Sequence, residues 1–231
     1  MSPTARPPGL ERELAHHRAG RIVVGVDEVG KGAWAGPLLI GVAVLPSSVH
    51  DEGVPFAVRD SKAMTPGARE AVAAPLADWC ADWALGWASA AECDHLGMAA
   101  AQRLACRRAL DGLRVRPDVA ITDGRWDFVS PMVDRVEMVV GGDAECASVA
   151  AASVLAKVAR DAYMRELAAD LPHWSFETNK GYPCLRHRAG LAALGPSIEH
   201  RTTWSFMDTA VPWSGAPRRR RHDAEPTLFD I

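Results

Sequence analysis

The fold is decided by one stretch, R-I-V-V-G-V-D-E-V-G-K-G-A-W-A-G-P-L-L-I-G-V-A-V-L, which occupies residues 21–45. Its two ends, residues 21–27 and 37–45, are apolar and rich in β-branched side chains, a composition that predicts two buried strands. Three glycines in the intervening segment predict a tight loop. We therefore expect the acidic pair Asp27-Glu28 to stand where a buried strand meets a glycine-rich turn.

Strand-like and helix-like segments alternate along the rest of the chain. Thr65-Pro66 has the pattern of a helix N-cap followed by proline in the first helical position, and it predicts a helix that reaches about Cys80. Apolar periodicity and glycine-containing turns predict the other elements: strands over 83–90, 119–122 and 132–140, and helices over 92–113, 144–171 and 185–194. This alternation predicts an α/β fold with a mixed sheet.

The composition is that of an ordinary globular protein, since 48% of the 231 residues are apolar and 24% are charged. The net charge of −3 does not by itself indicate a nucleic-acid partner, so a polyanion would have to bind through local patches or metal ions. The longest apolar run, residues 38–45, is far shorter than the ~20 residues that span a bilayer. The first twenty residues lack the apolar core of a secretory signal, so we expect a cytoplasmic protein without membrane contact.

Five cysteines are widely spaced, and none belongs to a C-x-x-C pair: Cys80, Cys93, Cys106, Cys146 and Cys184. An odd number at such spacing argues against a disulfide framework and against a zinc site. We expect these residues to be small buried thiols in a reducing compartment.

Four acidic residues stand at boundaries of the predicted elements: Asp27, Glu28, Asp123 and Asp143. Carboxylates at strand ends and at a helix start are typical of sites for Mg²⁺ or Mn²⁺, hard ions that prefer oxygen ligands. Because adjacent strand residues point to opposite faces, Asp27 and Glu28 can share one site only where the strand is already turning.

Each acid also has an ordinary interpretation. Asp123-Gly124 is a common turn pair, Asp143 could cap the long helix, and Asp27-Glu28 could be a solvated strand end. The residues by themselves leave a metal site and these structural roles open.

Six separated segments narrow the choice. They are V-G-V-D-E-V-G-K-G-A-W-A-G-P (24–37), R-D-S-K (59–62), I-T-D-G (121–124), G-G-D-A (141–144), A-A-A-S-V-L-A-K-V-A-R-D-A-Y-M (150–164) and N-K-G-Y-P (179–183). In this order they closely resemble the bacterial ribonuclease HII family over about residues 21–207. The resemblance implies a ribonuclease-H-like α/β fold, in which helices flank a central mixed sheet and a small helical C-terminal extension follows.

The expected organisation has three parts. Residues 1–20 form an N-terminal arm, and residues 21–211 form the catalytic domain with its C-terminal extension. Residues 212–231 form an Arg-rich tail, which its Pro-, Arg- and acid-rich composition predicts to be disordered.

The resemblance also implies the chemistry. The catalytic acids that bind two divalent ions, Mn²⁺ or Mg²⁺, correspond to Asp27, Glu28, Asp123 and Asp143. The implied reaction is two-metal hydrolysis of the RNA strand of RNA–DNA hybrids and of duplex DNA on the 5′ side of an embedded ribonucleotide, which leaves 3′-OH and 5′-phosphate ends. We expect a monomer that binds these two substrates. A junction resolvase of the same superfamily and a catalytically weak hybrid-binding protein are the alternatives.

The substrate-binding residues follow from the same comparison. Gly30, Lys31 and Gly32 correspond to a loop that senses a ribose 2′-OH, where glycines let the backbone approach the sugar closely. Tyr182 corresponds to a tyrosine that packs against the nucleotide at the RNA–DNA junction. This loop argues against a resolvase, and the intact set of four acids argues against a protein that only binds.

Ser61 and Lys62 correspond to phosphate-contacting positions of the family.

The sequence departs from the family pattern at three positions. Lys31 stands where the family loop usually has arginine, and lysine keeps the charge without the planar fork that binds phosphate in two places. Ala63 replaces a usual second lysine, and Trp34 replaces a smaller residue. These departures concern substrate affinity rather than the chemistry.

The C-terminal end suggests a further partner. Four arginines at 218–221 add non-specific attraction for phosphate, and the polar segment after them leads to Leu228-Phe229. This apolar pair has no core to join and is similar to the Leu-Phe peptides that bind bacterial sliding clamps, although the usual glutamine is missing. A sliding clamp is therefore a candidate partner, and the alternative is a tail that folds back onto its own domain or has no role.

Overall fold

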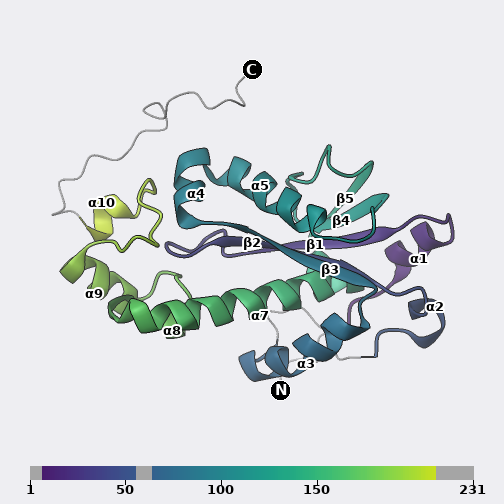
Figure 1. Ribbon diagram of the computed structural model, residues 1–231, viewed down its shortest axis with the longest axis horizontal. Coiled ribbons are helices and arrows are strands. Elements are labelled where there is room, and N and C mark those ends of the chain that lie inside the picture. Colours follow the sequence, from purple (N-terminus) through teal and green to yellow (C-terminus); the bar gives the residue numbers. More distant parts are fainter. Residues whose placement is uncertain (1–6, 56–63, 212–231) are drawn as a thin grey trace. The chain divides into compact units, whose positions relative to one another are not determined.

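The computed structural model describes residues 7–55 and 64–211, and Figure 1 shows how their elements are arranged. In this part of the chain, five strands form one sheet in the order β3-β2-β1-β4-β5. β1 (Val23–Val29) pairs antiparallel with β2 (Leu38–Val44) and parallel with β4 (Val119–Asp123), and β4 pairs parallel with β5 (Arg135–Val139). β3 (Asp82–Ala88) lies at the other edge of the sheet. The predicted mixed sheet of an α/β fold is confirmed.

Helices make up much of the remaining described chain. They are α1 (Glu11–His17), α2 (Val49–Glu52), α3 (Pro66–Trp79), α4 (Ala90–Leu96), α5 (Met98–Asp111), α6 (Gly142–Glu145), α7 (Ala147–Asp170), α8 (Phe176–Asn179), α9 (Leu185–Leu194) and α10 (Met207–Ala210), with the 3₁₀ turn η1 (Pro172–Trp174). The hydroxyl of Thr65 caps α3 as predicted, because it accepts a hydrogen bond from the Ala68 N–H at 3.2 Å. Within 7–55 and 64–211, none of the helices combines the length and the apolar character needed to cross a bilayer.

Two of the predicted helices are interrupted. The helix predicted over 92–113 is in fact two helices, because Gly97 ends α4 with a φ of 75°, a conformation that favours glycine. The helix predicted over 144–171 is preceded by the separate short helix α6, because Cys146 between α6 and α7 is extended, with φ −118° and ψ 123°.

The edge strand β5 is shorter than the strand predicted over 132–140. The N–H of Met132 donates to the Val129 carbonyl at 2.9 Å, so this residue belongs to a turn. Arg135 is the first residue that pairs with β4, where it lies opposite Val119.

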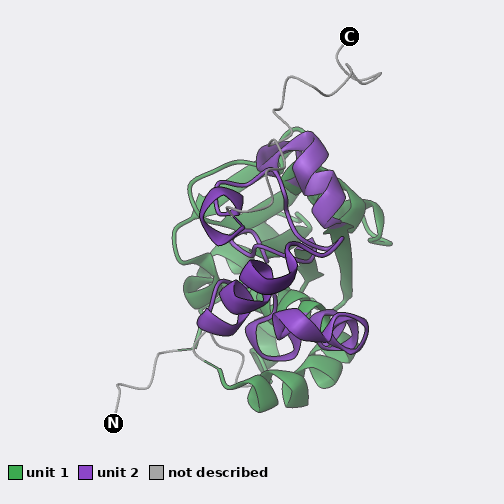
Figure 2. Ribbon diagram, turned by 90° about the vertical axis from the view of Figure 1, so that its left-hand side faces the viewer, with its two compact units in different colours: residues 1–29, 39–87, 102–160 green, residues 30–38, 88–101, 161–231 purple. Residues whose placement is uncertain are grey.

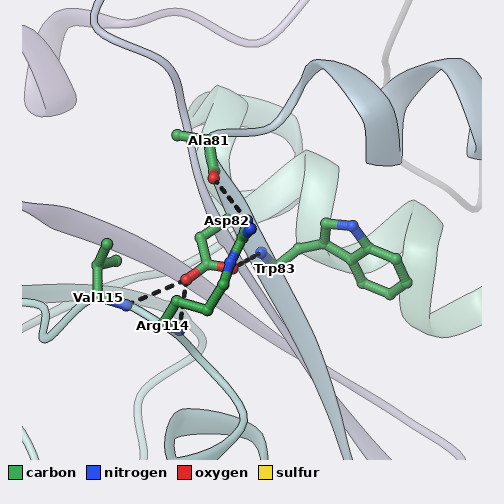
Figure 3. Close-up of polar contacts among 5 residues, drawn as sticks. All are labelled: Ala81, Asp82, Trp83, Arg114 and Val115. Atoms are coloured by element: carbon green, nitrogen blue, oxygen red, sulfur yellow. Dashed lines mark hydrogen bonds and ion pairs between the residues drawn. The ribbon is translucent and has the colours of Figure 1, made fainter.

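At the opposite edge, β3 begins at Asp82, whose carboxylate ties the strand to the segment after α5 (Figure 3). Asp82 is only 3% exposed and accepts hydrogen bonds from the main-chain N–H groups of Trp83, Arg114 and Val115 at 2.6–3.2 Å. The Arg114 side chain adds an ion pair with Asp82 at 3.2 Å and a hydrogen bond to the Ala81 carbonyl. Every polar contact of this buried acid is structural.

The chain falls into two compact units, which Figure 2 colours separately. Among the described residues, unit 1 comprises 7–29, 39–55, 64–87 and 102–160, and unit 2 comprises 30–38, 88–101 and 161–211. Helices α5 and α7 each begin in one unit and end in the other. The four predicted acids belong to unit 1, whereas the glycine loop and the predicted tyrosine belong to unit 2.

In unit 1, helix α7 packs so closely on the sheet that two strand positions must be glycine. A Cβ on Gly25 would overlap the Ser148 carbonyl group, and a Cβ on Gly41 would lie 2.5 Å from the Ala152 carbonyl oxygen. Gly41 is the ladder partner of Asp27, and paired residues point to the same face of a sheet. The Asp27 side chain therefore faces α7.

The other face of this sheet is covered by α5, and Figure 1 shows the two helices on opposite sides. Side chains alternate along a strand, so Glu28 points away from α7 and toward α5. There the amide of Gln102 donates a hydrogen bond to Glu28 Oε2. Helix α5 also contacts β3, where a Cβ on Gly86 would overlap the Ala105 carbonyl.

In unit 2, several large aromatic side chains are packed into the core. Trp174, Phe176 and Phe206 are buried together with Leu191, and Trp34 stacks on Phe206 with ring centroids 4.3 Å apart. The helices that carry the C-terminal residues of this core, η1 to α10, form the predicted small extension. Trp34, which departs from the family pattern, is thus a packing residue of unit 2.

All five cysteines are free thiols, as predicted, and four of them are buried. Burial raises the pKa of the Cys80, Cys106 and Cys146 thiols to about 12. These groups are therefore protonated at neutral pH and unreactive, because the thiolate is the nucleophile.

Candidate functional site

Asp27 lies near the C-terminal end of β1 and is 6% exposed. It faces α7, where the hydroxyl of Ser153 hydrogen-bonds to its carboxylate, and the backbone N–H of Glu28 donates to the same group. Few waters can reach this carboxylate, so its protonation depends on its neighbours in the protein.

Asp123 stands beside Asp27 because of the strand register. Val26 of β1 lies opposite Thr122 of the parallel strand β4, so the next residue of each strand is one of the two acids. The N–H of Gly142 donates to Asp123 Oδ1 at 2.8 Å and holds that carboxylate in place.

Asp143 is brought to the same region by the glycine pair before it. Gly141 has a φ of 74°, and a Cβ on Gly142 would lie only 3.3 Å from the Asp123 Cα. Asp143 follows in the first turn of α6 and is 4% exposed. The G-G-D sequence therefore carries the chain closely past the end of β4.

These three acids interact electrostatically. The pKa of Asp27 is raised to about 7, chiefly by burial and to a smaller extent by the nearby charges of Asp143 and Asp123, while the hydrogen bonds from Ser153 and Glu28 act in the opposite direction. At neutral pH the carboxyl of Asp27 is therefore close to half protonated. Repulsion of this kind is relieved by a bound cation.

Glu28, the fourth acid, is directed elsewhere. β1 stays paired with β2 as far as Val29, so the strand does not turn at the acidic pair. The Glu28 carboxylate lies on the opposite face from Asp27 and is held by Gln102, which is 1% exposed. The structure thus brings together Asp27, Asp123 and Asp143, and gives Glu28 a separate anchor.

The donor set fits a hard divalent ion by its chemistry, because every candidate ligand is a carboxylate. Among the residues that the structure describes, no three His, Cys, Asp or Glu side chains form a ready-made site for one ion. The fit rests instead on the desolvated Asp27 and its two acidic neighbours, a cluster that a divalent cation would neutralise.

In unit 2, the loop Gly30-Lys31-Gly32 forms a turn that the Ala33 N–H closes by donating to the Gly30 carbonyl at 3.2 Å. Gly30 has a φ of 86°, and its own N–H donates to Tyr182 Oη at 3.2 Å. The predicted loop and the predicted tyrosine are therefore in direct contact, although 152 positions separate them in the sequence.

The N-K-G-Y-P segment fixes the backbone at Tyr182. The Asn179 side chain accepts from the Gly181 N–H at 2.7 Å and donates to the Trp174 carbonyl at 2.6 Å. Gly181 has a φ of 82°, and a Cβ there would overlap the carbonyl of Ala35. Both the conformation and the close approach require glycine at this position.

Two buried histidines support Tyr182 from behind. His187 Nδ1 lies 3.0 Å from the Tyr182 carbonyl oxygen, and His187 Nε2 lies 2.9 Å from His200 Nε2. Burial and the neighbouring His187 lower the pKa of His200 to about 3, and burial also lowers the pKa of His187, so both rings are neutral. His187 then donates to Tyr182, His200 donates to His187, and His200 Nδ1 accepts from the Ser197 N–H at 2.9 Å.

Two predicted site residues lie outside the described part of the chain, and three residues that contact the site were not predicted from the sequence. Ser61 and Lys62 lie outside the described residues. Gln102, Ser153 and His187 were not singled out from the sequence. Gln102 could have been identified from its place in the apolar stripe of α5, because a single amide on a buried helix face needs a hydrogen-bond partner.

Comparisons with known proteins show the family to which the chain belongs. The family model described as Ribonuclease HII matches residues 24–207. The protein named Ribonuclease HII from Streptomyces griseus is 45% identical over 224 residues, which are 96% of this chain and 92% of that protein. Ribonuclease H2 from Pyrococcus horikoshii OT3 has a similar crystal structure, with a TM-score of 0.68 and 29% identity, over 82% of this chain and 96% of that chain.

A further structural neighbour is found in the PCNA:RNase HII complex from Archaeoglobus fulgidus, with a TM-score of 0.68 over 90% of this chain and 100% of that chain. At 22% identity this likeness shows the fold alone. The family model and the Streptomyces relative cover most of the sequence, including all four acids, the glycine loop and Tyr182. On these grounds the chain belongs to the ribonuclease HII family.

Proposed function

We propose that this ribonuclease H hydrolyses the RNA strand of RNA–DNA hybrids and cuts duplex DNA on the 5′ side of an embedded ribonucleotide, leaving 3′-OH and 5′-phosphate ends. The observation that carries the proposal is the interacting group of Asp27, Asp123 and Asp143 near the ends of β1 and β4. The buried carboxylates of Asp27 and Asp143, with the partly buried Asp123 beside them, do not stabilise the fold, because desolvated like charges are unfavourable. Phosphodiester hydrolysis with divalent ions explains the cluster, because these carboxylates would bind the ions.

The ribonuclease HII family depends on divalent metal ions. We assign two ions, Mn²⁺ or Mg²⁺, to the carboxylates of Asp27, Asp123 and Asp143, and Glu28 joins this ligand set only when its carboxylate leaves the hydrogen bond to Gln102. When bound, two such ions supply an activated water and stabilise the leaving 3′-oxygen. The protein contributes orientation, since Ser153, the Gly142 N–H and Gln102 each hold one of these carboxylates.

Substrate recognition is assigned to unit 2. The loop Gly30-Lys31-Gly32 offers main-chain groups to the 2′-OH, which deoxyribose lacks, and Tyr182 packs against the nucleotide. The hydrogen bond between Gly30 and Tyr182 supports placing both at the same sugar. Ser61, Lys62 and the ammonium group of Lys31 are proposed to contact phosphates.

Family membership favours this hydrolase over the two alternatives, a junction resolvase and a protein that only binds hybrids. The alternatives differ from it in their products. Of these three candidates, the type-2 ribonuclease H is the one expected to make a single cut directly on the 5′ side of the ribonucleotide in a duplex that contains one.

The first prediction concerns pH. The pKa of Asp27 in the folded protein, about 7, lies above its ordinary value of 3.8, so the folded state retains a proton that the unfolded state releases. The stability that this proton confers is complete below about pH 4 and is lost as pH rises through 7. In EDTA, Asp27→Asn should therefore melt several degrees higher than wild type at pH 8 and about equally at pH 4, since 1 kcal/mol shifts the Tm by about 2–4 °C.

Metal ions provide the control for this prediction. Mn²⁺ requires the ionised carboxylate, so it should raise the wild-type Tm more at pH 8 than at pH 5 and should not do so in Asp27→Asn. Equal Tm values for the two proteins at pH 8 in EDTA would show that Asp27 is not a strained, buried acid.

The second prediction concerns catalysis. Asp123→Asn removes a ligand charge at nearly constant volume, so cleavage of a duplex with one ribonucleotide should fall by more than about a hundredfold, beyond the usual effect of losing an outer ligand contact. The matched control is Asp118→Asn, the same change at the other end of β4, where the carboxylate accepts from the Ile22 N–H. Near-normal turnover of Asp123→Asn in saturating Mn²⁺ contradicts the assignment of this acid.

The third prediction concerns Tyr182. Stacking on a nucleotide contributes ~1–3 kcal/mol per base, so Tyr182→Ala should lower kcat/KM for a single embedded ribonucleotide by about 5- to 150-fold. Tyr182→Phe keeps the ring and removes only the hydroxyl that accepts from Gly30, so it should retain most of the activity. A large fall in Tm with unchanged relative activity for the alanine variant would instead make Tyr182 a structural residue.

The fourth prediction concerns the tail, which lies outside the described residues. We propose that Leu228-Phe229 docks on a sliding clamp, and the clamp complex of the Archaeoglobus relative motivates the test. Deletion of residues 224–231 should leave cleavage of a short duplex unchanged and abolish binding to the purified clamp. Equal clamp binding by the full-length and truncated proteins, or no binding by either, rejects the proposal.

A further inference from the structure

We propose that Arg201 is a positioning residue for ribose recognition. Its buried guanidinium orients the loop Gly30-Lys31-Gly32 so that the main-chain N–H groups of Lys31 and Gly32 face the substrate. This inference rests on the proposed role of the loop in sensing the 2′-OH. It makes the discrimination between ribose and deoxyribose by the loop depend on a side chain that does not touch the nucleotide.

Arg201 is completely buried, at 0% exposure, and it is directed at the loop. Its Nη1 donates to the Lys31 carbonyl at 2.9 Å, and its Nη2 donates to the carbonyls of Gly30 at 2.7 Å and Gly36 at 3.1 Å. One planar group thus binds carbonyls at the start and at the end of the glycine-rich segment. Hydrogen bonds to three carbonyl oxygens offset part of the free-energy cost of burying this cation.

The direction of the loop N–H groups follows from these bonds. In a trans peptide the carbonyl of one residue and the N–H of the next point in opposite directions. Because the carbonyls of Gly30 and Lys31 point at Arg201, the N–H groups of Lys31 and Gly32 point away from it. Gly32 is exposed, so its N–H is directed away from the buried guanidinium and toward the surface.

The turn geometry leads to the same conclusion. The Ala33 N–H closes the turn on the Gly30 carbonyl, which makes Lys31 and Gly32 its two central residues. The N–H groups of central residues are not used by the closing hydrogen bond of such a turn. Two successive outward N–H groups form a concave donor site that suits a hydroxyl or phosphate oxygen.

The base of the Arg201 side chain is itself fixed. Its main-chain N–H donates to the Trp34 carbonyl at 2.8 Å, so the residue is attached to the loop through backbone as well as side chain. The next two residues, Thr202 and Thr203, donate through their hydroxyls to the carboxylate of Asp94 at 2.9 and 2.7 Å. These bonds hold the guanidinium where it can reach the carbonyls of Gly30, Lys31 and Gly36.

Arginine is required because of the shape of its donor group. A guanidinium presents a rigid fork of N–H donors, whereas a lysine ammonium is a compact charge that cannot span carbonyls of Gly30, Lys31 and Gly36 in the same way. Arg201→Lys therefore keeps the buried charge and loses the orientation of the loop. The loss should affect only the contact to the 2′-OH.

The test compares two duplexes of one sequence, one with a single ribonucleotide and one made entirely of DNA. The KM for the first and the inhibition constant of the second, used as a competitor, are measured for wild type and for Arg201→Lys. The control is Arg116→Lys, the same change at an exposed ion pair with Asp134, before the N-terminal end of β4 and away from the acids. Tm and Mn²⁺ affinity are recorded for all three proteins.

We expect Arg201→Lys to raise the KM for the ribonucleotide duplex about tenfold, the effect of losing one or two hydrogen bonds, while the inhibition constant of the DNA duplex and the Mn²⁺ affinity stay unchanged. Arg116→Lys should change neither constant. A parallel rise of both constants in Arg201→Lys, or no change in their ratio, overturns the inference. If wild type itself binds both duplexes equally, the loop does not read ribose, and the proposed recognition fails before Arg201 is considered.

A measurement on the wild-type protein covers the case in which Arg201→Lys folds poorly. The amide NMR signals of Lys31 and Gly32 are followed while each duplex is added to the metal-free protein. Both amides should shift with the ribonucleotide duplex and much less with the DNA duplex, because they face the 2′-OH. Equal shifts with the two duplexes, or none with either, would show that Arg201 does not direct these groups to the sugar.

Discussion

β1 is hydrogen-bonded on both sides, antiparallel to β2 and parallel to β4, and this pairing determines where the acids of unit 1 point. The ladder continues past the acidic pair, so Asp27 faces α7 and Glu28 faces α5. The parallel register then sets Asp123 beside Asp27 without any contribution from a loop. A slip of one residue in this register would move each acid to the other face, because side chains alternate along a strand. The site therefore depends on the same hydrogen bonds that hold the sheet together.

The close packing of α7 strengthens this constraint and makes it unfavourable for a charged group. Gly25 and Gly41 let the helix backbone approach β1 and β2, which excludes water from the face that carries Asp27. An isolated carboxylate in such a place is destabilising, and acidic neighbours increase the effect. Ser153 offsets only part of it, since the pKa of Asp27 is still raised to about 7. The acids thus lower the stability of the folded state of unit 1, which is the usual consequence of a preorganised charged site.

The sequence was informative wherever local rules apply. The β-branched runs predicted β1 and β2, Thr65-Pro66 predicted the start of α3, and α9 has the predicted bounds. The break at Gly97 was missed because a helical pattern continues across it, although its positive φ ends α4. Helix α1 falls in the segment expected to be an arm, and its position depends on Glu13, which binds Ser148 at a separation of 135 residues. Contacts of that range cannot be read from periodicity or turn chemistry.

The loop in unit 2 shows why a departure from the family pattern can leave its role intact. The side chain of residue 31 is the part that we propose to contact phosphate, and there lysine supplies charge without the arginine fork. The main chain of the same residue is governed by other groups: its carbonyl is bound by Arg201, and the Gly30 N–H by Tyr182. None of these bonds involves the Lys31 side chain, so the orientation of the backbone does not depend on which cation occupies the position. Under the proposed function, affinity for phosphate and selectivity for ribose are thus assigned to different atoms of one residue, and we expect exchange of arginine for lysine to alter the first without altering the second.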